Sequence, residues 1–507
     1  MSQNKNVLLR ITNLKQYFPL KKKGQYVKAN DGITLDIYEG EVFGLVGESG
    51  CGKSTFGRTI LQLYKQTDGR TMYYGRSLDD IAPKYVFETI KNAEKEREEI
   101  KKLNEKRDAL QKEYDSLSET EQYAKHAALD AAIKKANDAY LNLTNILGGL
   151  VAVEDLSKIK ETYTKHYDIA LKRRELTEKL METEAKREDA EFKGRNTSKL
   201  EEDVKNYQKE IESLSEQLKE SHKKIEELRA EYKDVEGFKE YDEHYDNGID
   251  LARLEYNEIR LLRRDLQIVF QDPYSSLNPR LTIGQIIGEG LLAHNIFSKN
   301  SPRMQDYILE VMDDCGLAPY FLHRFPHQFS GGQRQRISIA RALAVKPKFV
   351  VCDEAVSALD VSIQSQIINL LQDLREKQDL TYLFITHDLS VVKYISDRIG
   401  VMYLGNMIEL SESEKLFKKP IHPYTQALIA AIPTTDPDGK KELQILEGDI
   451  PSPVNPPSGC KFHTRCRYCT EICKQVVPSW EEVEPNHFVA CHHPLLDGLD
   501  IEKHREE

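Results

Sequence analysis

Hydrophobic and polar positions divide this chain into a body and one long polar stretch. In the body, short unbroken apolar runs occur at Glu41–Gly47, Lys348–Cys352 and Thr381–Thr386. Runs of this length are typical of strands that are buried on both faces of a parallel sheet, and the patterns that follow them are typical of helices. The pattern therefore predicts an α/β fold built around a parallel sheet.

The polar stretch covers residues 83–255. It contains no proline after Pro83, and the next proline is Pro273, so no proline interrupts a helix there. Apolar residues recur at spacings of four and three, with Ser221 in the one polar slot: Leu200, Val204, Tyr207, Ile211, Leu214, Leu218, Ile225, Leu228 and Tyr232. A heptad seam with charged flanks predicts a long α-helical coiled-coil insertion.

Three breaks are expected in this helical stretch, near Ser116–Glu121, at Gly148–Gly149 and at Gly194–Thr197. They divide it into four helical pieces, which would form two antiparallel hairpins because an inserted segment must return to its starting point. Two interpretations of the insertion remain open at this point. It is either a docking arm for another protein or a solvated helix bundle with no partner of its own.

Charge is concentrated in the same stretch. The 507 residues carry a net charge of −11, and residues 91–250, with 31 basic and 40 acidic residues, account for −9 of it. Neither part has the basic excess of a protein that binds nucleic acid phosphates, so no nucleic acid partner is expected. No apolar run is long enough to span a membrane and no secretory signal is visible, so we expect a cytoplasmic protein.

A phosphate-binding loop follows the first apolar run. Residues 47–55 read Gly-Glu-Ser-Gly-Cys-Gly-Lys-Ser-Thr, which is a complete P-loop pattern between a strand and a helix. The backbone N–H groups of such a loop surround phosphate oxygens, the lysine contacts the β/γ-phosphates and the serine hydroxyl can ligate Mg²⁺. The nucleotide-binding residues predicted here are Gly47, Ser49, Gly50, Gly52, Lys53, Ser54 and Thr55.

Two later strands end in residues suited to the same chemistry. Asp353 and Glu354 follow the run at 349–352, where Asp353 would hold the Mg²⁺ shell and Glu354 would orient or deprotonate the attacking water. His387 follows the run at 381–386 and would contact the γ-phosphate. Ser330, Gly331, Gly332 and Gln333 open a further helix, whose N-terminus is a second anion site. Two such helix starts in one chain suggest a site shared between two subunits.

These motifs together resemble the ATP-binding cassette family. Ser330–Gln333 match its signature, Gln271 its Q-loop, Asp360 its D-loop and His387 its H-loop. The resemblance implies a RecA-like nucleotide-binding domain with a helical subdomain, and a head-to-tail pair of cassettes that clamps ATP between the P-loop of one chain and the signature of the other. It also implies that Gln271 contacts Mg²⁺ or water, that Asp360 communicates across the pair, and that an aromatic residue, Phe18 rather than Tyr17, stacks on adenine.

The segments 271–280, 356–364 and 422–428 narrow the resemblance to the dipeptide, oligopeptide and nickel importer ATPases, and most closely to the F-type subunit of oligopeptide permease. That family implies an ATPase that energises peptide uptake from the cytoplasmic side of a bacterial membrane. Its implied partners are a second cassette subunit, normally a paralogue, two transmembrane permease subunits and an extracellular or periplasmic peptide-binding protein. Membrane association would be peripheral, through these partners.

The eight cysteines include a cluster near the C-terminus. Cys460, Cys466, Cys473 and Cys491 are soft ligands suited to zinc or to an iron–sulfur cluster, and Cys469 is an extra thiol. Spacing does not choose between these metals, and reduced cysteines that pack as small hydrophobic residues are a further alternative. The resemblance implies a [4Fe–4S] cluster on those four cysteines.

We therefore expect a discontinuous ATP-binding domain at 1–82 and 256–432, a coiled-coil insertion at 83–255 and a small Cys-rich C-terminal region at 433–507. Its first part, Pro433–Pro457, has the composition of a linker. The main rival is a DNA-processing ATPase of the Rad50 type, which also carries coiled coils within a cassette. An acidic insertion that begins before Gln271 and lacks a Cys-x-x-Cys hook disfavours it.

Overall fold

The computed structural model describes residues 6–496 except 23, 118, 300, 358 and 433–447. Two compact units are present in the chain. Unit 1 comprises Met1–Gly75, Asp250–Ala252 and Ile259–Glu507, and unit 2 comprises Arg76–Ile249 and Arg253–Glu258. The chain therefore leaves unit 1 after Gly75, touches it again at Asp250–Ala252, and returns to it for good at Ile259.

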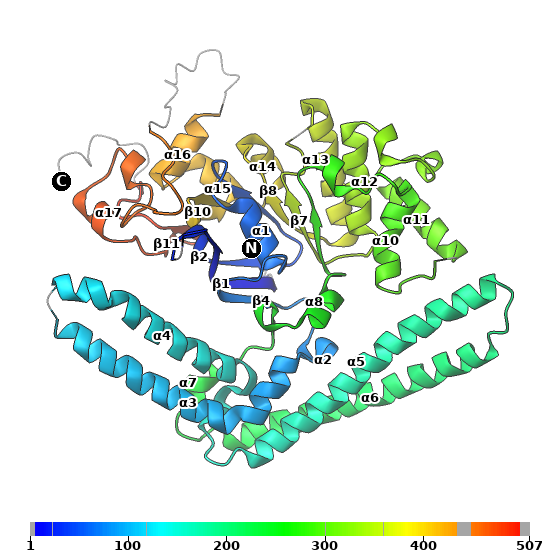
Figure 1. The fold of residues 1–507 in the computed structure, drawn as a ribbon, viewed down its shortest axis with the longest axis horizontal. Coiled ribbons are helices and arrows are strands. Elements are labelled where there is room, and N and C mark those ends of the chain that lie inside the picture. Colours follow the sequence, from blue (N-terminus) through cyan, green and yellow to red (C-terminus); the bar gives the residue numbers. More distant parts are fainter. Residues whose placement is uncertain are drawn as a thin grey trace. The chain divides into compact units, whose positions relative to one another are not determined.

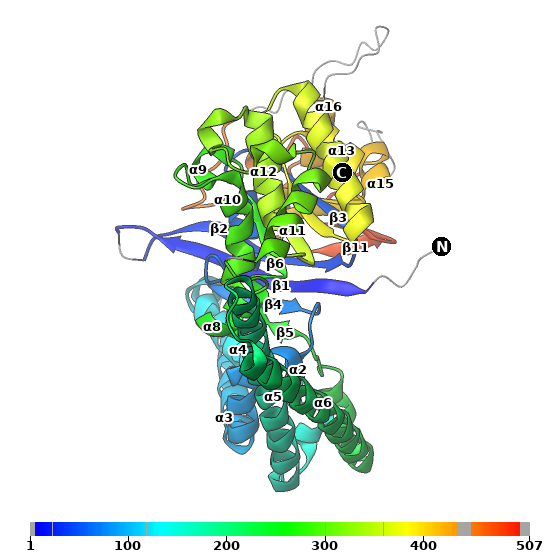
Figure 2. The ribbon, with the colours of Figure 1, turned by 90° about the vertical axis from the view of Figure 1, so that its right-hand side faces the viewer.

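An eight-stranded sheet forms the centre of unit 1 (Figures 1 and 2). Five neighbouring strands are parallel, and three more extend the sheet in antiparallel fashion. In spatial order the strands are β6 (Leu266–Val269), β7 (Phe349–Asp353), β8 (Thr381–Ile385), β3 (Val42–Val46), β9 (Arg398–Tyr403), β10 (Asn406–Glu412), β12 (His487–Val489) and β11 (Glu481–Glu484). Every residue of β3, β7 and β8 is buried, as the unbroken apolar runs predict.

A second, four-stranded sheet has the order β2 (Tyr26–Tyr38), β1 (Val7–Pro19), β4 (Asp68–Tyr73) and β5 (Ile249–Asp250). Its long strand β1 pairs antiparallel with both β2 and β4. Alternating burial along β1 shows that one face of this sheet packs inward and the other faces solvent.

Helices cover the central sheet of unit 1. Their bounds are α1 (Lys53–Ile60), α9 (Pro273–Ser276), α10 (Ile283–Ala293), α11 (Pro302–Asp314), α12 (Gly331–Leu343), α13 (Val361–Gln378), α14 (Leu389–Ile395), α15 (Ser413–Lys418), α16 (Pro423–Ala430) and α17 (Glu471–Gln475), while α8 (Tyr256–Leu262) spans the return from unit 2. Helices α10, α11 and α12 lie together (Figure 1) and bury Ile286, Met312 and Ile339 in the same core as the sheet. This group forms the helical part of an α/β cassette.

The C-terminal segment is built into unit 1 through the sheet. Strand β12 pairs with β10, and β11 pairs with β12, so the last strands of the chain continue the central sheet. A fully buried polar contact fixes this junction, because His487 Nε2 lies 2.8 Å from Glu409 Oε1. The other oxygen of Glu409 accepts a hydrogen bond from the backbone N–H of His422. The Cys-rich segment is thus attached to the core by a strand pair that its composition does not reveal.

Unit 2 consists of two helical hairpins and short connecting elements. The helices are α2 (Leu78–Ile81), α3 (Lys84–Asp115), α4 (Glu119–Leu147), α5 (Ser157–Phe192), α6 (Ser198–Tyr232) and α7 (Phe238–Asp242). Helix α3 packs against α4, and α5 packs against α6. The predicted four pieces and their three breaks are confirmed. Gly194 has φ of +62° just after α5, a left-handed conformation that glycine adopts at little cost and that ends a helix.

The predicted seam of α6 is a buried stripe. Val204, Leu214, Leu218, Ile225 and Leu228 are all at most 5% exposed, while their charged neighbours face solvent. The polar slot is also buried, and the Ser221 hydroxyl lies 3.1 Å from His166 Nδ1 on the partner helix α5. A period of 3.5 thus places these residues between the helices of a hairpin. Whether the hairpins supercoil as a coiled coil stays a prediction.

Two sequence predictions fall outside the described residues. These are most of the linker at Pro433–Pro457 and, within the first predicted break, the side chains of Ser118 and Glu121, where a Ser-x-x-Glu pattern predicts a capping box. Within the described part of the chain, every helix is too short or too polar to cross a membrane.

Candidate functional site

The P-loop lies between β3 and α1, and two of its glycines are required by the close approach of neighbouring backbone. A Cβ atom on Gly47 would lie 2.2 Å from the carbonyl oxygen of Met402, and one on Gly52 would lie 2.0 Å from that of Ala29. Both residues also have positive φ, of 151° and 103°. Only glycine satisfies these positions, so the loop retains the tight curvature that directs N–H groups toward a phosphate.

The predicted phosphate lysine is held inside this loop. Lys53 begins α1 and is 4% exposed, and its Nζ donates to the carbonyl oxygens of Gly47 at 2.8 Å and Glu48 at 3.0 Å. Ser54 and Thr55 follow in the first turn of α1, and Ser49 and Gly50 lie in the loop itself. The ammonium, the helix N-terminus and the loop N–H groups converge as a triphosphate site requires.

Asp353 is the last residue of β7, beside β8 and next but one to β3 in the central sheet. Its side chain is fully buried, and one oxygen accepts a hydrogen bond from Arg58 Nη2 on α1 at 3.0 Å. The other oxygen, Oδ1, is buried without a hydrogen-bond partner. A buried carboxylate oxygen with unused acceptor capacity fits the hydrated shell of Mg²⁺, for which Ser54 would be the hydroxyl ligand from the P-loop.

Three predicted catalytic side chains meet at the end of β7. Gln271 Nε2 donates to Glu354 Oε2 at 2.6 Å, and His387 Nδ1 lies 3.7 Å from Glu354 Oε1. Gln271 lies 83 positions before Glu354 in the sequence, and it meets Glu354 and His387 because β6, β7 and β8 are neighbours in the sheet. The Glu354 backbone has φ of 49°, a left-handed conformation that is rare for a residue with a side chain. The cluster can orient a water molecule and accept its proton.

The signature residues open α12. Ser330 is its N-cap and forms a capping box with Gln333, since each side chain accepts a hydrogen bond from the backbone N–H of the other. Gly331 and Gly332 form the first turn and are partly exposed. Asp360 is the exposed N-cap residue of α13. Figure 1 places α12 and α1 in different parts of unit 1. The structure does not bring the signature to the P-loop of the same chain.

The predicted adenine-stacking residue lies at the end of β1. Phe18 is partly exposed and makes an edge-to-face contact with Tyr64, with ring centroids 5.3 Å apart. The alternative residue, Tyr17, is committed elsewhere, because its hydroxyl donates a hydrogen bond to Asp31. This difference favours Phe18 for stacking.

Two arginines that contact the site were not predicted from the sequence. Arg58 pairs with Asp353, and Arg465, from the Cys-rich segment, forms a two-bond ion pair with Glu48 in the P-loop. Burial opposes the charged form of Arg58, but hydrogen bonds to Tyr64 and Asp353 raise its pKa overall. No local pattern marks either arginine, because 295 residues separate Arg58 from Asp353 and 417 separate Arg465 from Glu48.

The four predicted cysteine ligands are close to one another. Cys460, Cys466, Cys473 and Cys491 line one small cavity, together with His463, His492 and His493. Burial raises the pKa of Cys466 and of Cys491 to about 12, which favours thiols over thiolates. Among the residues that the structure describes, no three His, Cys, Asp or Glu side chains are arranged to hold a metal ion. The donor types suit an iron–sulfur cluster, but their arrangement gives it no support.

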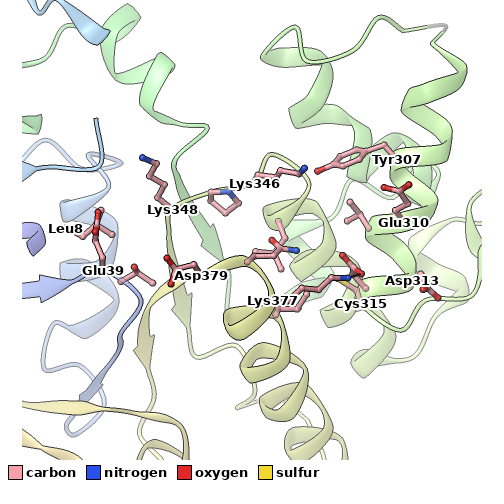
Figure 3. A pocket seen from close by; sticks show the side chains of 17 residues that line it. Leu8, Glu39, Tyr307, Glu310, Asp313, Cys315, Lys346, Lys348, Lys377 and Asp379 are labelled. Carbon is pink, nitrogen blue, oxygen red and sulfur yellow. Dashed lines mark hydrogen bonds and ion pairs between the residues drawn. The ribbon is translucent and has the colours of Figure 1, made fainter. Parts of the chain in front are cut away.

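A separate cavity of about 750 Å³ lies at the opposite edge of the sheet (Figure 3). Its lining includes Lys348, just before β7, and Thr381, the first residue of β8. Asp353, Glu354 and His387 follow the other ends of the same strands. This cavity, with its mixed lining of lysines and carboxylates, is therefore not the nucleotide site.

Comparisons with known proteins give the same family as the sequence motifs. The family described as ABC transporter matches residues 30–248 and 238–357, and the family described as oligopeptide/dipeptide transporter, C-terminal region, matches residues 408–473. AppF, an oligopeptide transport ATP-binding protein of Bacillus subtilis, is 34% identical over 96% of this chain and 98% of its own length. YkfD of the same bacterium bears a name of the same kind and is 35% identical over 96% of this chain and 95% of its own length.

Further matches are shorter or weaker. BOV_A0347 of Brucella ovis, named as a peptide import ATP-binding protein, is 53% identical over 48% of this chain and 77% of its own length. The solved ATP-binding cassette MJ0796, bound to ADP and Pi, aligns with 80% of this chain and 99% of its own at 17% identity and a TM-score of 0.42. None of these relatives is named as a DNA-processing ATPase. The chain belongs to the ABC transporter family, within the group of oligopeptide transport ATP-binding proteins.

Proposed function

We propose that this chain binds and hydrolyses ATP as a subunit of an ABC importer and energises the uptake of oligopeptides. The observation that carries the proposal is the convergence of Gln271 and His387 on Glu354, next to Asp353 and beside the P-loop strand. Identity to oligopeptide transport ATP-binding proteins over almost the whole chain supports the substrate class.

In the proposed reaction, Lys53 and the loop N–H groups hold the β/γ-phosphates, and Phe18 stacks on adenine. Asp353 and Ser54 would hold Mg²⁺, which neutralises charge on the phosphates when bound. Glu354 accepts the proton of the attacking water, Gln271 orients that water and His387 contacts the γ-phosphate. These roles follow from where the side chains lie, at the carboxyl ends of β6, β7 and β8.

A second subunit completes the site in this proposal. The signature residues Ser330–Gln333 would close on ATP bound to the P-loop of a partner cassette, normally a paralogue, and Asp360 would contact that partner. Exposure of Ser330 and Asp360 and the separation of α12 from α1 support this arrangement. The two permease subunits and a peptide-binding protein would complete the importer, which holds this chain at the cytoplasmic face of the membrane.

Two finer assignments belong to the same proposal. The hairpins of unit 2 would be a coiled-coil insertion at residues 83–255, for which the buried stripe of α6 is the support. Cys460, Cys466, Cys473 and Cys491 would ligate a [4Fe–4S] cluster, for which the soft thiol donors are the support. Iron and sulfide analysis of anaerobically purified protein tests the second assignment. We expect about four iron atoms per chain, and colourless, iron-free protein would contradict the cluster assignment.

The proposed transport function is tested by uptake of a labelled oligopeptide in cells that lack this chain and are complemented with variants. Lys53→Ala removes the phosphate-binding ammonium and should abolish uptake, whereas Lys65→Ala, at an exposed lysine just beyond α1, should restore it like the wild type. Uptake that does not depend on the chain would contradict the proposal. Stimulation of the purified ATPase by DNA would favour the DNA-processing alternative instead.

A further inference from the structure

An acidic residue lies inside the phosphate loop. Glu48 follows Gly47, and its backbone carbonyl is 3.0 Å from the Lys53 ammonium that the triphosphate would contact. A negative side chain at this place repels an anion with several charges, and the repulsion acts over the few ångströms that separate groups of one loop. An unpaired Glu48 would therefore oppose ATP binding.

Arg465 pairs with this carboxylate in forked geometry. Its Nη1 donates to Glu48 Oε2 at 2.8 Å and its Nη2 donates to Oε1 at 3.1 Å, and the arginine side chain is 5% exposed. Two parallel bonds fix the direction of the carboxylate as well as neutralise it. An arginine side chain keeps its positive charge at any pH at which the protein is folded, so the cation persists beside Glu48.

Neighbouring groups hold the pair in place. The backbone N–H of Glu48 donates to the Tyr424 hydroxyl at 3.0 Å, and the Arg465 guanidinium is within hydrogen-bond distance of the Tyr403 hydroxyl. Tyr403 and Tyr424 are both at most 1% exposed and pack edge to face. The loop is thus braced from the side of β9 and α16, away from its own helix α1.

The segment that contains Arg465 makes a second contact, near the strand that bears the predicted adenine-stacking residue. Lys461 Nζ lies 2.9 Å from Asp31 Oδ2 and 3.2 Å from the carbonyl oxygen of Leu404. Asp31 in turn accepts the hydroxyl of Tyr17, the neighbour of Phe18 in β1. The turn of residues 461–465, between Cys460 and Cys466, therefore reaches both the phosphate loop and the strand that bears the predicted adenine contact.

We propose that Arg465 is a positioning residue for the nucleotide, which neutralises Glu48 and turns it away from the phosphates so that the P-loop presents net positive charge to ATP. The proposal rests on the ATP site proposed above. It gives the C-terminal region a role within its own chain, since part of that region acts as a brace on the phosphate loop.

The test is binding of Mg²⁺-AMP-PNP, a non-hydrolysed ATP analogue, to the purified full-length chain by calorimetry. Arg465→Ala leaves the Glu48 charge unpaired and should raise Kd about tenfold. In the double variant Arg465→Ala/Glu48→Gln, the repelling charge is gone, and Kd should return to within about twofold of that of Glu48→Gln alone. The loss of affinity caused by Arg465→Ala should also be smaller for AMP, which carries fewer negative charges than the triphosphate analogue. Arg467→Ala, at an exposed arginine two residues away, is the matched control and should bind like the wild type.

The outcomes separate the inference from the function on which it rests. If the wild-type chain does not bind the analogue, the proposed ATP site fails. If the wild type binds and Arg465→Ala binds equally well, or if the double variant binds as weakly as Arg465→Ala, the electrostatic role of Arg465 is wrong. A thermal melt of each variant detects misfolding, and binding is measured at a temperature at which all variants are folded. Rescue of the Kd by Glu48→Gln then supports the electrostatic role of Arg465. If Arg465 only held the loop in shape, removal of its partner Glu48 would not restore nucleotide binding.

Discussion

At the scale of single residues, Glu354 combines a strained backbone with a central position in the proposed catalytic cluster. Its φ of 49° is left-handed, which costs a residue with a Cβ atom about 1–2 kcal/mol relative to glycine. The strain is held by the hydrogen bond from the Glu354 N–H to the carbonyl oxygen of Ile385 at 2.9 Å. A strained backbone of this kind can direct a side chain toward a site, and the surrounding structure keeps the backbone in the strained conformation.

This strain predicts different stabilities for two inactive variants. Glu354→Gly removes both the side chain and the strain, whereas Glu354→Ala removes the side chain and keeps the Cβ atom. We expect the glycine variant to have a free energy of unfolding about 1 kcal/mol higher than that of the alanine variant, although glycine usually destabilises. Denaturant unfolding of both proteins measures the difference, and a less stable glycine variant would show that the backbone is not strained.

His422 predicts a specific dependence of stability on pH. It is fully buried, and burial lowers its pKa to about 3, while its Nδ1 accepts a hydrogen bond from the backbone N–H of Tyr424. Below the unfolded pKa of about 6.5 the unfolded chain binds a proton that the folded chain does not. Stability should therefore fall as pH falls, by about 2 kcal/mol between pH 7 and pH 5 from this residue. Denaturant unfolding of the wild type and of His422→Gln across that pH range tests this prediction. If the free energy of unfolding depended on pH equally in both proteins, the role given to His422 would be wrong.

At the scale of elements, the buried stripe of α6 predicts where the insertion is sensitive. Leu218 is 5% exposed between α5 and α6, and Lys219 beside it faces solvent. Leu218→Ala should destabilise unit 2 by about 2–4 kcal/mol, because it loses burial and leaves a cavity. Lys219→Ala should change stability by less than about 0.5 kcal/mol. Urea unfolding followed by the helical circular dichroism signal measures the stability of both variants. Equal losses of stability in Leu218→Ala and Lys219→Ala would show that the seam is not buried.

The elements also show why part of the site was predictable from sequence. The P-loop, Asp353, Glu354 and His387 each follow a short apolar run, and parallel strands bring such ends to one edge of a sheet. The helix breaks were predictable because glycine or cap residues mark them. The pair of Arg465 with Glu48 was not predictable, since 417 residues separate the partners and no local pattern in either segment indicates the other. Strands β11 and β12 were missed for a similar reason, because they are only four and three residues long.

At the scale of the whole molecule, unit 2 has a hydrophobic core of its own. Residues from α3, α4, α5 and α6, including Ile90, Leu147, Ile159 and Leu228, form one cluster within the unit. A fragment of residues 76–258 should therefore fold by itself, with high helix content and a cooperative thermal transition. A fragment without a cooperative transition would show that the insertion depends on unit 1 for its structure.

The most direct test of the account is the change of Glu354 to Gln in the purified full-length chain. Glutamine preserves the shape of the side chain and can still contact Gln271, but it cannot accept the proton of the attacking water. We predict that the Kd for Mg²⁺-ATP stays within about twofold of the wild-type value while the rate of hydrolysis falls by about 10²–10⁴-fold. Hydrolysis at the wild-type rate in this variant would contradict the assignment of Glu354 and, with it, the proposed site.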